Sequence, residues 1–463
     1  MQHGDRASLL PAVWERIDAD LDDHLGRIRA YLRQPSVAST GEGVGAGADM
    51  TASLIEAAGG EARVVETPGS PVVIGSIAGG ETRLLRYGMY DVQPADEDGW
   101  TSPPFAAEVH ELPGVGPAIV ARGAANSKSC FAAFCLALAS LRDVAEVPVS
   151  LRFVVDGEEE LGSVHLKPVM EAHRDELSAD AAFDLDLSSE LSGESPVYLG
   201  CKGIVSFNLI CAGGDWGGPA DRAMHSSAGV LVASPAWSIV RALGALVGPD
   251  ETPRLKTLER PPLTEVERGL LDELAAHFDV DEYLSDSSVS RLKRDGDARE
   301  LVEALLYDPA INVNGFEAGY AGGGKTIVPE VARAAVDIRT PRGTDTDAVT
   351  EEAIALIHAA APEVTVEPYD VCPPAHTPAD SAVARAMIES HRDAGSPVAV
   401  WPTAPWWAPY YLFDEVLGLE FASGGVGHSG RAHATDEYAS VEGIRQHMRQ
   451  SMAFLYRYAT EHE

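Results

Sequence analysis

The stretch from Val154 to Ser163 reads Val-Val-Asp-Gly-Glu-Glu-Glu-Leu-Gly-Ser and decides the fold of this chain. The apolar run before it, residues 149–155, is typical of a buried strand and ends abruptly in carboxylates. Open α/β sheets place their sites at the carboxyl ends of such strands. Adjacent glutamates repel one another, so a cation, a shared proton or hydrogen-bond donors must balance them. The alternative is a solvated acidic turn.

Polar groups follow other predicted strands in the same way, which disfavours that alternative. They lie at residues 89–91, 122–128, 186 and 433–437. Acids and a histidine brought from distant positions to one sheet edge suit a hard or borderline divalent cation. The sequence therefore predicts one site assembled from several loops.

The spacing of apolar residues predicts an α/β fold in which a second domain interrupts the first. We expect a mixed, mostly parallel sheet flanked by helices in residues 1–203, resuming in 373–463. Residues 204–372 read as an inserted α+β domain, because a strand, a long helix, an alternating strand and a further helix follow in order. A chain of 463 residues is too long for one typical core.

Composition limits the partners and the compartment. The formal net charge of −36 disfavours nucleic acid and anionic membrane surfaces as partners. The five cysteines lack metal-ligand spacing and read as reduced core thiols, which predicts a cytoplasmic protein. The start of the chain, Met1 to Arg6, lacks the pattern of a signal peptide, and no apolar run is long enough to span a membrane.

Six motifs, in this order, resemble those of a known family. They are Gly-x-Tyr-Asp-Val-Gln-Pro (88–94), Arg-Gly-Ala (122–124), Glu-Glu-Leu-Gly-Ser (159–163), His-Ser (225–226), Thr-Ile-Val-Pro (326–329) with Arg339, and His-Ala-x-x-Glu (433–437). The sequence is similar to the zinc exopeptidases and amidohydrolases that include carnosinase, aminoacylase and succinyl-diaminopimelate desuccinylase. The carnosinase-like dipeptidase branch is the most similar, on the stretches 91–94 and 312–315. The resemblance runs from about residue 20 to the C-terminus.

The resemblance implies a catalytic α/β domain with an inserted lid domain that forms a homodimer. It assigns Glu159 as general base, and Asp91 as the acid that orients the first metal-binding histidine. His225 corresponds to a lid histidine that stabilises the oxyanion in the partner's site. Arg339 corresponds to the arginine that binds the substrate carboxylate. Three metal ligands match by position: Glu160, Asp186 and His433.

Two positions depart from the family's ligand set. The first histidine is Met89 here, and the metal-bridging aspartate is Asn126. A thioether is a poor zinc ligand, and a neutral amide does not bridge two dications as a carboxylate does. We therefore expect either no metal or one divalent ion, such as zinc. For Met89 core packing, and for Asn126 a hydrogen bond to Glu159 or Glu160, are the expected roles.

The substrate-binding positions also differ. Trp406 and Trp407 stand where the family has a Gly-Gly-Ser loop, which predicts a smaller or more apolar pocket. Lys202 replaces the family's hinge arginine. We assign both tryptophans, Lys202 and Asn314 to substrate binding together with Arg339.

Three functions fit these residues. The first is hydrolysis of an amide bond in a small peptide or N-acyl amino acid, with Glu159 as acid/base. The second is metal-independent acid/base chemistry on an amino-acid-like substrate, such as isomerisation, elimination, cyclisation or amide formation, because clustered carboxylates push their pKa values apart. The third is a non-catalytic binding protein.

Overall fold

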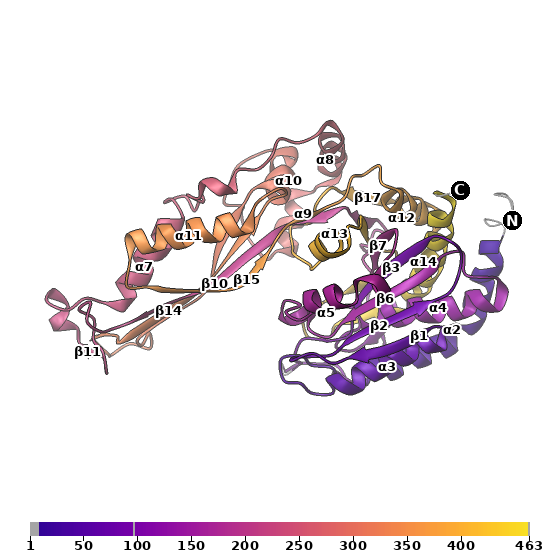
Figure 1. The fold of residues 1–463 in the computed structure, drawn as a ribbon, viewed down its shortest axis with the longest axis horizontal. Coiled ribbons are helices and arrows are strands. Elements are labelled where there is room, and N and C mark those ends of the chain that lie inside the picture. Colours follow the sequence, from indigo (N-terminus) through magenta and orange to yellow (C-terminus); the bar gives the residue numbers. More distant parts are fainter. Residues whose placement is uncertain (1–8, 96–97, 462–463) are drawn as a thin grey trace. The chain divides into compact units, whose positions relative to one another are not determined.

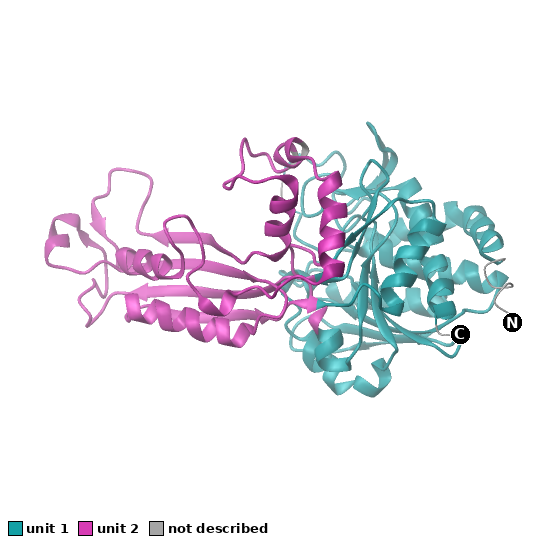
Figure 2. Cartoon of the chain, turned by 90° about the horizontal axis from the view of Figure 1, so that it is seen from above, with its two compact units in different colours: residues 1–200, 376–402, 412–463 teal, residues 201–375, 403–411 magenta. Residues whose placement is uncertain are grey.

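The computed structural model describes residues 9–95 and 98–461. The N-terminal stretch Met1 to Arg6, discussed above for its lack of a signal peptide, lies outside these residues. The described residues form two compact units: unit 1 lies within the ranges Met1–Gly200, His376–Pro402 and Leu412–Glu463, and unit 2 comprises Cys201–Ala375 and Thr403–Tyr411 (Figure 2). The α/β fold with a mostly parallel central sheet is the predicted one.

Unit 1 is built on a large twisted sheet (Figure 1). From one edge to the other its strands are β1 (Glu61–Val65), β2 (Val72–Ile77), β6 (Ser150–Asp156), β3 (Arg83–Met89), β7 (Ala181–Leu185), β18 (Phe421–Gly424), β8 (Ser195–Tyr198) and β17 (Val398–Trp401). The central strands β6, β3, β7 and β18 run parallel, and β1, β2 and β8 introduce the antiparallel pairings. The carboxyl ends of the central strands therefore share one edge.

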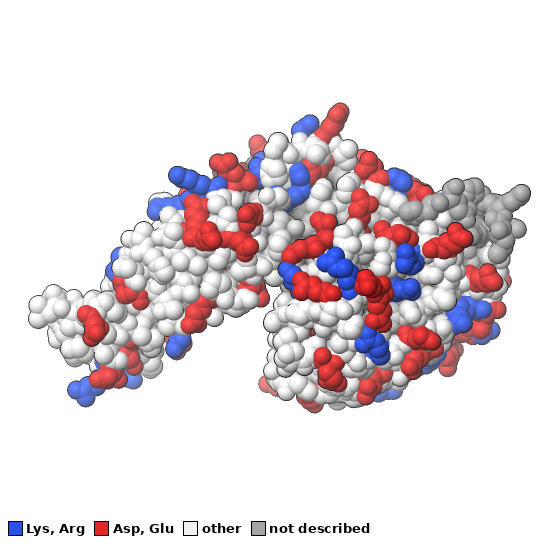
Figure 3. Space-filling model, viewed as in Figure 1, with Lys and Arg blue, Asp and Glu red and all other residues white. Residues whose placement is uncertain are grey.

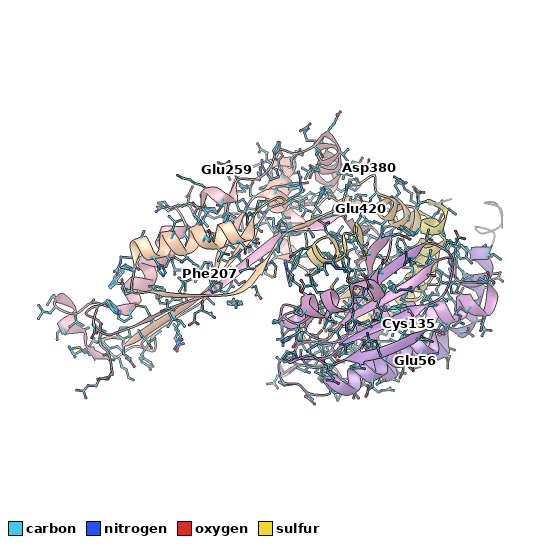
Figure 4. The ribbon with its side chains drawn as sticks, viewed as in Figure 1. Glu56, Cys135, Phe207, Glu259, Asp380 and Glu420 are labelled. Atoms are coloured by element: carbon cyan, nitrogen blue, oxygen red, sulfur yellow. The ribbon has the colours of Figure 1, made fainter. Side chains whose placement is uncertain are left out.

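Helices of unit 1 cover this sheet and pack on one another. They are α2 (Leu10–Leu32), α3 (Val44–Ala57), α4 (Lys128–Val144), α5 (Leu166–Ala172), α6 (Arg174–Leu177), α12 (Ala382–Asp393), α13 (Tyr411–Leu417) and α14 (Val441–Glu461). Helix α4 is buried along almost its whole length because Cys, Phe, Ala and Leu occupy every face of it. Cys135 on this helix lies in the core of unit 1 (Figure 4).

A smaller antiparallel sheet in unit 1 carries the loop that precedes the last helix. Its strands, in order, are β19 (Ser429–Gly430), β20 (Tyr438–Ser440), β5 (Gly116–Val120) and β4 (Glu108–Leu112). The pairing of β20 with β5 brings the chain near residue 437 beside the chain that enters residues 121–128. Two of the predicted site loops are therefore neighbours.

Unit 2 is an α+β unit in which helices lie on an antiparallel sheet. The sheet order is β12 (Ala310–Ala318), β14 (Val331–Thr340), β10 (Gly203–Ala212) and β15 (Thr365–Cys372). Phe207 on β10 lies in the core of this unit, between the sheet and its helices (Figure 4). The remaining elements are β11 (Met224–His225), β13 (Ile327–Val328), α7 (Pro235–Leu246), α8 (Glu265–His277), α9 (Val280–Asp286), α10 (Ala298–Tyr307) and α11 (Thr346–Ala360). The short strands β9 (Gly200–Cys201) and β16 (Ala375–His376) lie where the chain passes from one unit to the other.

The five cysteines are buried and form no disulfide, as predicted; all lie within the described residues. Among those residues, no helix has both the length and the apolar character needed to cross a membrane. On the face drawn in Figure 3, basic side chains lie beside acidic ones on both units. Arg260, for example, pairs with Glu303 and Asp308. Much of the positive charge is thus balanced locally.

Two buried histidines make the stability of unit 1 sensitive to acid. Nε2 of His447 on α14 lies 3.2 Å from the carbonyl oxygen of Cys130. Nδ1 of His391 on α12 lies 2.8 Å from the carbonyl oxygen of Met387. Burial lowers the pKa of His447 to about 3 and the pKa of His391 to about 4. Below about pH 6.5 these two histidines are protonated in the unfolded chain but remain neutral in the folded chain. Acidification therefore favours unfolding.

We predict that His447→Gln reduces this dependence on pH. As the pH falls from about 6.5 to 4, the free energy of unfolding of the wild type should drop more steeply than that of the variant, by up to about 1.4 kcal/mol per pH unit. Urea denaturation at several pH values measures both slopes. His358→Gln, an exposed change on α11, is the control. Parallel curves for His447→Gln and wild type would contradict the prediction.

Candidate active site

The site lies at the carboxyl edge of the central strands of unit 1. Met89 at the end of β3 pairs in register with Asp156 at the end of β6. Strand β7 ends at Leu185, so Asp186 follows at the same edge. Met89 is buried, in keeping with the expected packing role. The parallel sheet thus brings together three of the loops predicted to form the site.

The turn that carries Glu159 and Glu160 is held by Asp91. The fully buried carboxylate of Asp91 accepts the backbone N–H of Glu159 at 3.2 Å and that of Glu160 at 3.1 Å. A second carboxylate, Asp156, accepts the N–H of Glu158 at 3.0 Å. Backbone donors therefore balance part of the negative charge that the sequence concentrates here.

Burial and mutual repulsion raise the pKa values of these acids. Desolvation, followed by the charges of Glu160 and Asp91, raises the pKa of Glu159 well above its usual range. Desolvation and the charges of Asp156 and Glu160 raise the pKa of Asp91. Burial raises the pKa of Asp156 to about 6. In each case the shift favours the protonated form of the carboxyl group.

Asn126 connects Glu160 to His433. Its Nδ2 donates to Oε1 of Glu160 at 2.9 Å and lies 2.8 Å from Nε2 of His433. The hydroxyl of Ser127 donates to Oδ1 of Asn126 at 3.0 Å, which fixes the orientation of the amide. The hydrogen bond to Glu160 is the contact expected for Asn126 from the sequence.

His433 has two alternative arrangements in this triangle. Its Nε2 also lies 3.0 Å from Oε1 of Glu160. A neutral ring accepts a hydrogen bond from Asn126 through Nε2, whereas a protonated ring donates to Glu160. The hydrogen bond with Glu160 raises the pKa of His433, so the carboxylate favours the protonated form.

Asp186 lies beside different partners. The thiol of Cys130 donates to its Oδ1 at 3.2 Å, and the side chain of Ser127 is a second polar neighbour of this carboxyl group. Burial and the nearby charge of Asp184 raise the pKa of Asp186 to about 7. The described contacts thus join Glu160 to His433 and place Asp186 against Cys130 and Ser127.

His225 belongs to unit 2 and is exposed there. Its Nδ1 accepts the N–H of Ser227 at 3.2 Å, and its Nε2 lies 3.3 Å from the hydroxyl of Thr326. Because Nδ1 accepts, the neutral ring carries its proton on Nε2. The hydroxyl of Thr326 is the acceptor within reach of that proton.

Arg339 and Lys202 give unit 2 two neighbouring cations. Arg339 on β14 is 30% exposed, and its Nε lies 3.5 Å from Asp337. Lys202 is buried, and its ammonium donates to the carbonyl oxygen of Asp308 at 2.7 Å. Burial, with a contribution from Arg339, lowers the pKa of Lys202 to about 8 despite the opposing effect of Asp308. Asp337 and Asp308 therefore balance part of this positive charge.

The other predicted substrate-binding residues also belong to unit 2. Trp406 exposes 36% of its surface, and its ring meets Tyr410 edge-on at 6.2 Å. Its carbonyl oxygen accepts the N–H of Lys202 at 3.1 Å, which places the two residues together. Trp407 follows and is partly exposed. Asn314 is exposed beside an irregularity in the pairing of β12 with β14.

Sequence reasoning assigned no role to three residues that organise the site. Gln93 donates to Oε2 of Glu160 at 2.7 Å. Glu437 accepts the N–H groups of Ala125 and Asn126, and Arg122 pairs with Glu437. All three lie inside the quoted motifs, so the signal was present, but only the contacts reveal what these side chains do.

The donor set does not fit a two-metal centre. Glu160 and His433 meet, and Asn126, where the resemblance places a bridging aspartate, faces both with the nitrogen of a neutral amide. Within residues 9–95 and 98–461, no group of three or more His, Cys, Asp or Glu side chains is arranged to hold a metal ion. Catalytic zinc takes three protein ligands.

The fold is that of an α/β protein, with a cluster of carboxylates at the carboxyl edge of its central strands. Residues 86–460 match peptidase family M20/M25/M40, and the chain belongs to this family. The family resemblance stated from the sequence is confirmed.

The chain is similar in sequence or structure to three proteins of known name. The chain is 29% identical over 276 residues to Beta-Ala-His dipeptidase of Homo sapiens, which covers 57% of this chain and 51% of that protein, so the match spans about half the length of that relative. An M20 family metallo-carboxypeptidase from Sulfolobus solfataricus has a similar structure, with a TM-score of 0.88 and 30% identity over 94% of this chain and 99% of that chain. The dipeptidase Dug1p from Saccharomyces cerevisiae shares the fold, with a TM-score of 0.81 and 21% identity over 97% and 98% of the two chains.

We predict that Met89→His combined with Asn126→Asp raises zinc binding. The double change supplies an imidazole and a bridging carboxylate beside Glu160 and His433, so the variant should retain more zinc per chain than the wild type after dialysis. Mass spectrometry of the metal content measures both proteins. Adding His433→Ala to the double variant is the control and should remove the gain. Equal zinc in wild type and double variant would mean that these positions are not ligand positions.

Proposed function

We propose that this protein hydrolyses an amide bond in a small peptide or N-acyl amino acid, with Glu159 as general base and then general acid. The observation that carries the proposal is the placement of Glu159. Its backbone is held by Asp91, and its carboxyl group has a raised pKa beside Glu160. Membership of the peptidase family and the similarity to dipeptidases support the same reaction.

In the proposed reaction Glu159 removes a proton from a water molecule as its oxygen attacks the amide carbonyl carbon. The C–O bond forms and the carbonyl oxygen becomes an oxyanion, which Nε2–H of His225 from a second copy of the chain would stabilise in the proposed dimer. Glu159 then delivers the proton to the amide nitrogen, the C–N bond breaks, and an acid and an amine leave. A positioned acid/base group supplies roughly 10²–10⁴-fold of rate enhancement.

The substrate would carry a carboxylate next to the amide. Arg339 and Lys202 form a cationic pair in unit 2, and an arginine fork suits bidentate binding of a carboxylate. The exposed face of Trp406 beside Lys202 would contact an apolar part of the substrate. Asn314 and Trp407 complete the proposed set of binding residues.

We propose further that the site works with no metal or with one divalent ion such as zinc. Glu160 and His433 supply an oxygen and a nitrogen ligand, and Asp186 would be a third ligand if it turned toward them. The amide of Asn126 between Glu160 and His433 also favours a second candidate function, acid/base chemistry without a metal on the same kind of substrate. Isomerisation, elimination, cyclisation and amide formation belong to this candidate class.

We also propose a homodimer formed through unit 2. Strand β12 is an edge strand of its sheet, and Val313 and Phe316 on it are 51% and 48% exposed. Edge strands with exposed apolar side chains are templates for pairing with another chain. A second copy would satisfy the open backbone groups and bury these side chains.

We predict that Glu159→Gln lowers turnover of a susceptible dipeptide or N-acyl amino acid by roughly 10²–10⁴-fold with little change in KM. The isosteric amide keeps the shape of the site but neither takes nor returns the proton. Assay of released amine across a panel of such compounds measures the effect. Glu171→Gln, an exposed change on α5, is the matched control.

Full activity in Glu159→Gln would refute the role of this residue. If the wild type hydrolyses no compound of the panel, but converts an amino-acid-like substrate in a Glu159-dependent way, the second candidate function replaces the first. Ligand binding without turnover, unaffected by Glu159→Gln, would instead identify a non-catalytic binding protein.

The dimer predicts a different result for each edge of the sheet in unit 2. Val313→Lys places a charge on β12 and should convert a dimer to a monomer in light scattering at micromolar concentration. Tyr369→Lys on the opposite edge strand β15, where Tyr369 is also 51% exposed, should leave the dimer intact. A monomeric wild type would overturn the proposed dimer.

A further inference from the structure

We propose that Arg122 and Glu437 are positioning residues that tie together three loops of the site, so that the site keeps its arrangement without a bound metal. The inference rests on the proposed site but not on the reaction it performs. The three loops comprise residues 89–94, 121–126 and 433–437, which carry Asp91, Asn126 and His433 respectively.

Glu437 joins the second loop to the third. Its side chain is 1% exposed, and its Oε1 accepts the backbone N–H of Ala125 at 2.8 Å and that of Asn126 at 2.9 Å. Its own carbonyl oxygen accepts the N–H of Ala121 at 2.9 Å. The backbone of Asn126 is therefore fixed by a residue four positions after His433.

Arg122 joins both of these loops to the first. Its guanidinium is 2% exposed and donates through Nη1 to Oε2 of Glu437 at 2.9 Å. Its Nη2 donates to the carbonyl oxygen of Pro94 at 3.0 Å, next to Gln93, which contacts Glu160. The ring of Trp100 lies 5.3 Å from the guanidinium carbon. One side chain thus contacts segments from both of the other loops.

The ion pair of Arg122 and Glu437 is buried, which makes its separation energetically unfavourable. A buried charge that loses its partner is strongly unfavourable, so the ion pair and its backbone donors open together or not at all. Both oxygens of Glu437 are engaged, one by Arg122 and the other by two N–H groups. A bridging metal would join separate loops through their side chains, whereas here a protein ion pair joins them through their backbones.

Amide hydrogen exchange on the full chain, read by mass spectrometry, tests the proposal without a substrate. In Glu437→Gln, peptides covering residues 89–94, 121–127 and 431–437 should exchange roughly tenfold faster, because the charge-assisted hydrogen bonds weaken. Arg122→Lys keeps the positive charge but cannot donate to Glu437 and to the carbonyl oxygen of Pro94 at the same time, as the guanidinium does. The same peptides should therefore exchange at an intermediate rate. Wild type treated with a chelator should match untreated wild type.

The matched control is another ion pair with a buried glutamate, Glu267 with Arg342 in unit 2, whose Oε1 and Nε are 3.1 Å apart. Glu267→Gln should leave the three loops unchanged. The proposal is overturned if the chelator accelerates exchange in the wild-type loops as much as Glu437→Gln does, or if both Glu437→Gln and Arg122→Lys exchange like wild type. If Glu437→Gln fails to fold, the exchange rates of the three loops in Arg122→Lys test the proposal. An inactive wild type or a fully active Glu159→Gln would count against the proposed function while leaving the exchange result intact.

Discussion

The organisation of this site depends on hydrogen bonds from the backbone to buried carboxylates. Asp91 accepts the N–H groups of Glu159 and Glu160, and Glu437 accepts those of Ala125 and Asn126. Carboxylates placed at a sheet edge repel one another, and such donors are what allows them to remain there. Without these donors, repulsion between the carboxylates would destabilise the turn that follows β6.

A side-chain donor also balances charge at this sheet edge. Asn126 faces Glu160 and His433 with an amide nitrogen, which attracts both groups where a second carboxylate would repel Glu160. The substitution thus supplies a hydrogen-bond donor at the position where the resemblance places a bridging acid. Met89 fills buried space at the end of β3, opposite Asp156.

The two units contribute different chemistry. Unit 1 concentrates carboxyl groups with raised pKa values, and unit 2 concentrates Arg339 and Lys202, of which Lys202 has a lowered pKa. Each unit thus supplies one kind of charge: acids in unit 1 and cations in unit 2.

The sequence by itself determined the α/β fold, the family and the strand-end position of the acids, because a buried strand that ends in carboxylates leaves few arrangements open. It also predicts that Met89 and Asn126 depart from the family's ligand set, since both stand inside recognisable motifs. The tertiary structure alone decided that Asn126 contacts Glu160 and His433, that Asp186 turns to Cys130, and that Arg122 and Glu437 tie three loops together. Those contacts join residues up to 315 positions apart, and no local pattern of hydrophobicity or turn residues specifies which side chains will meet across such a distance.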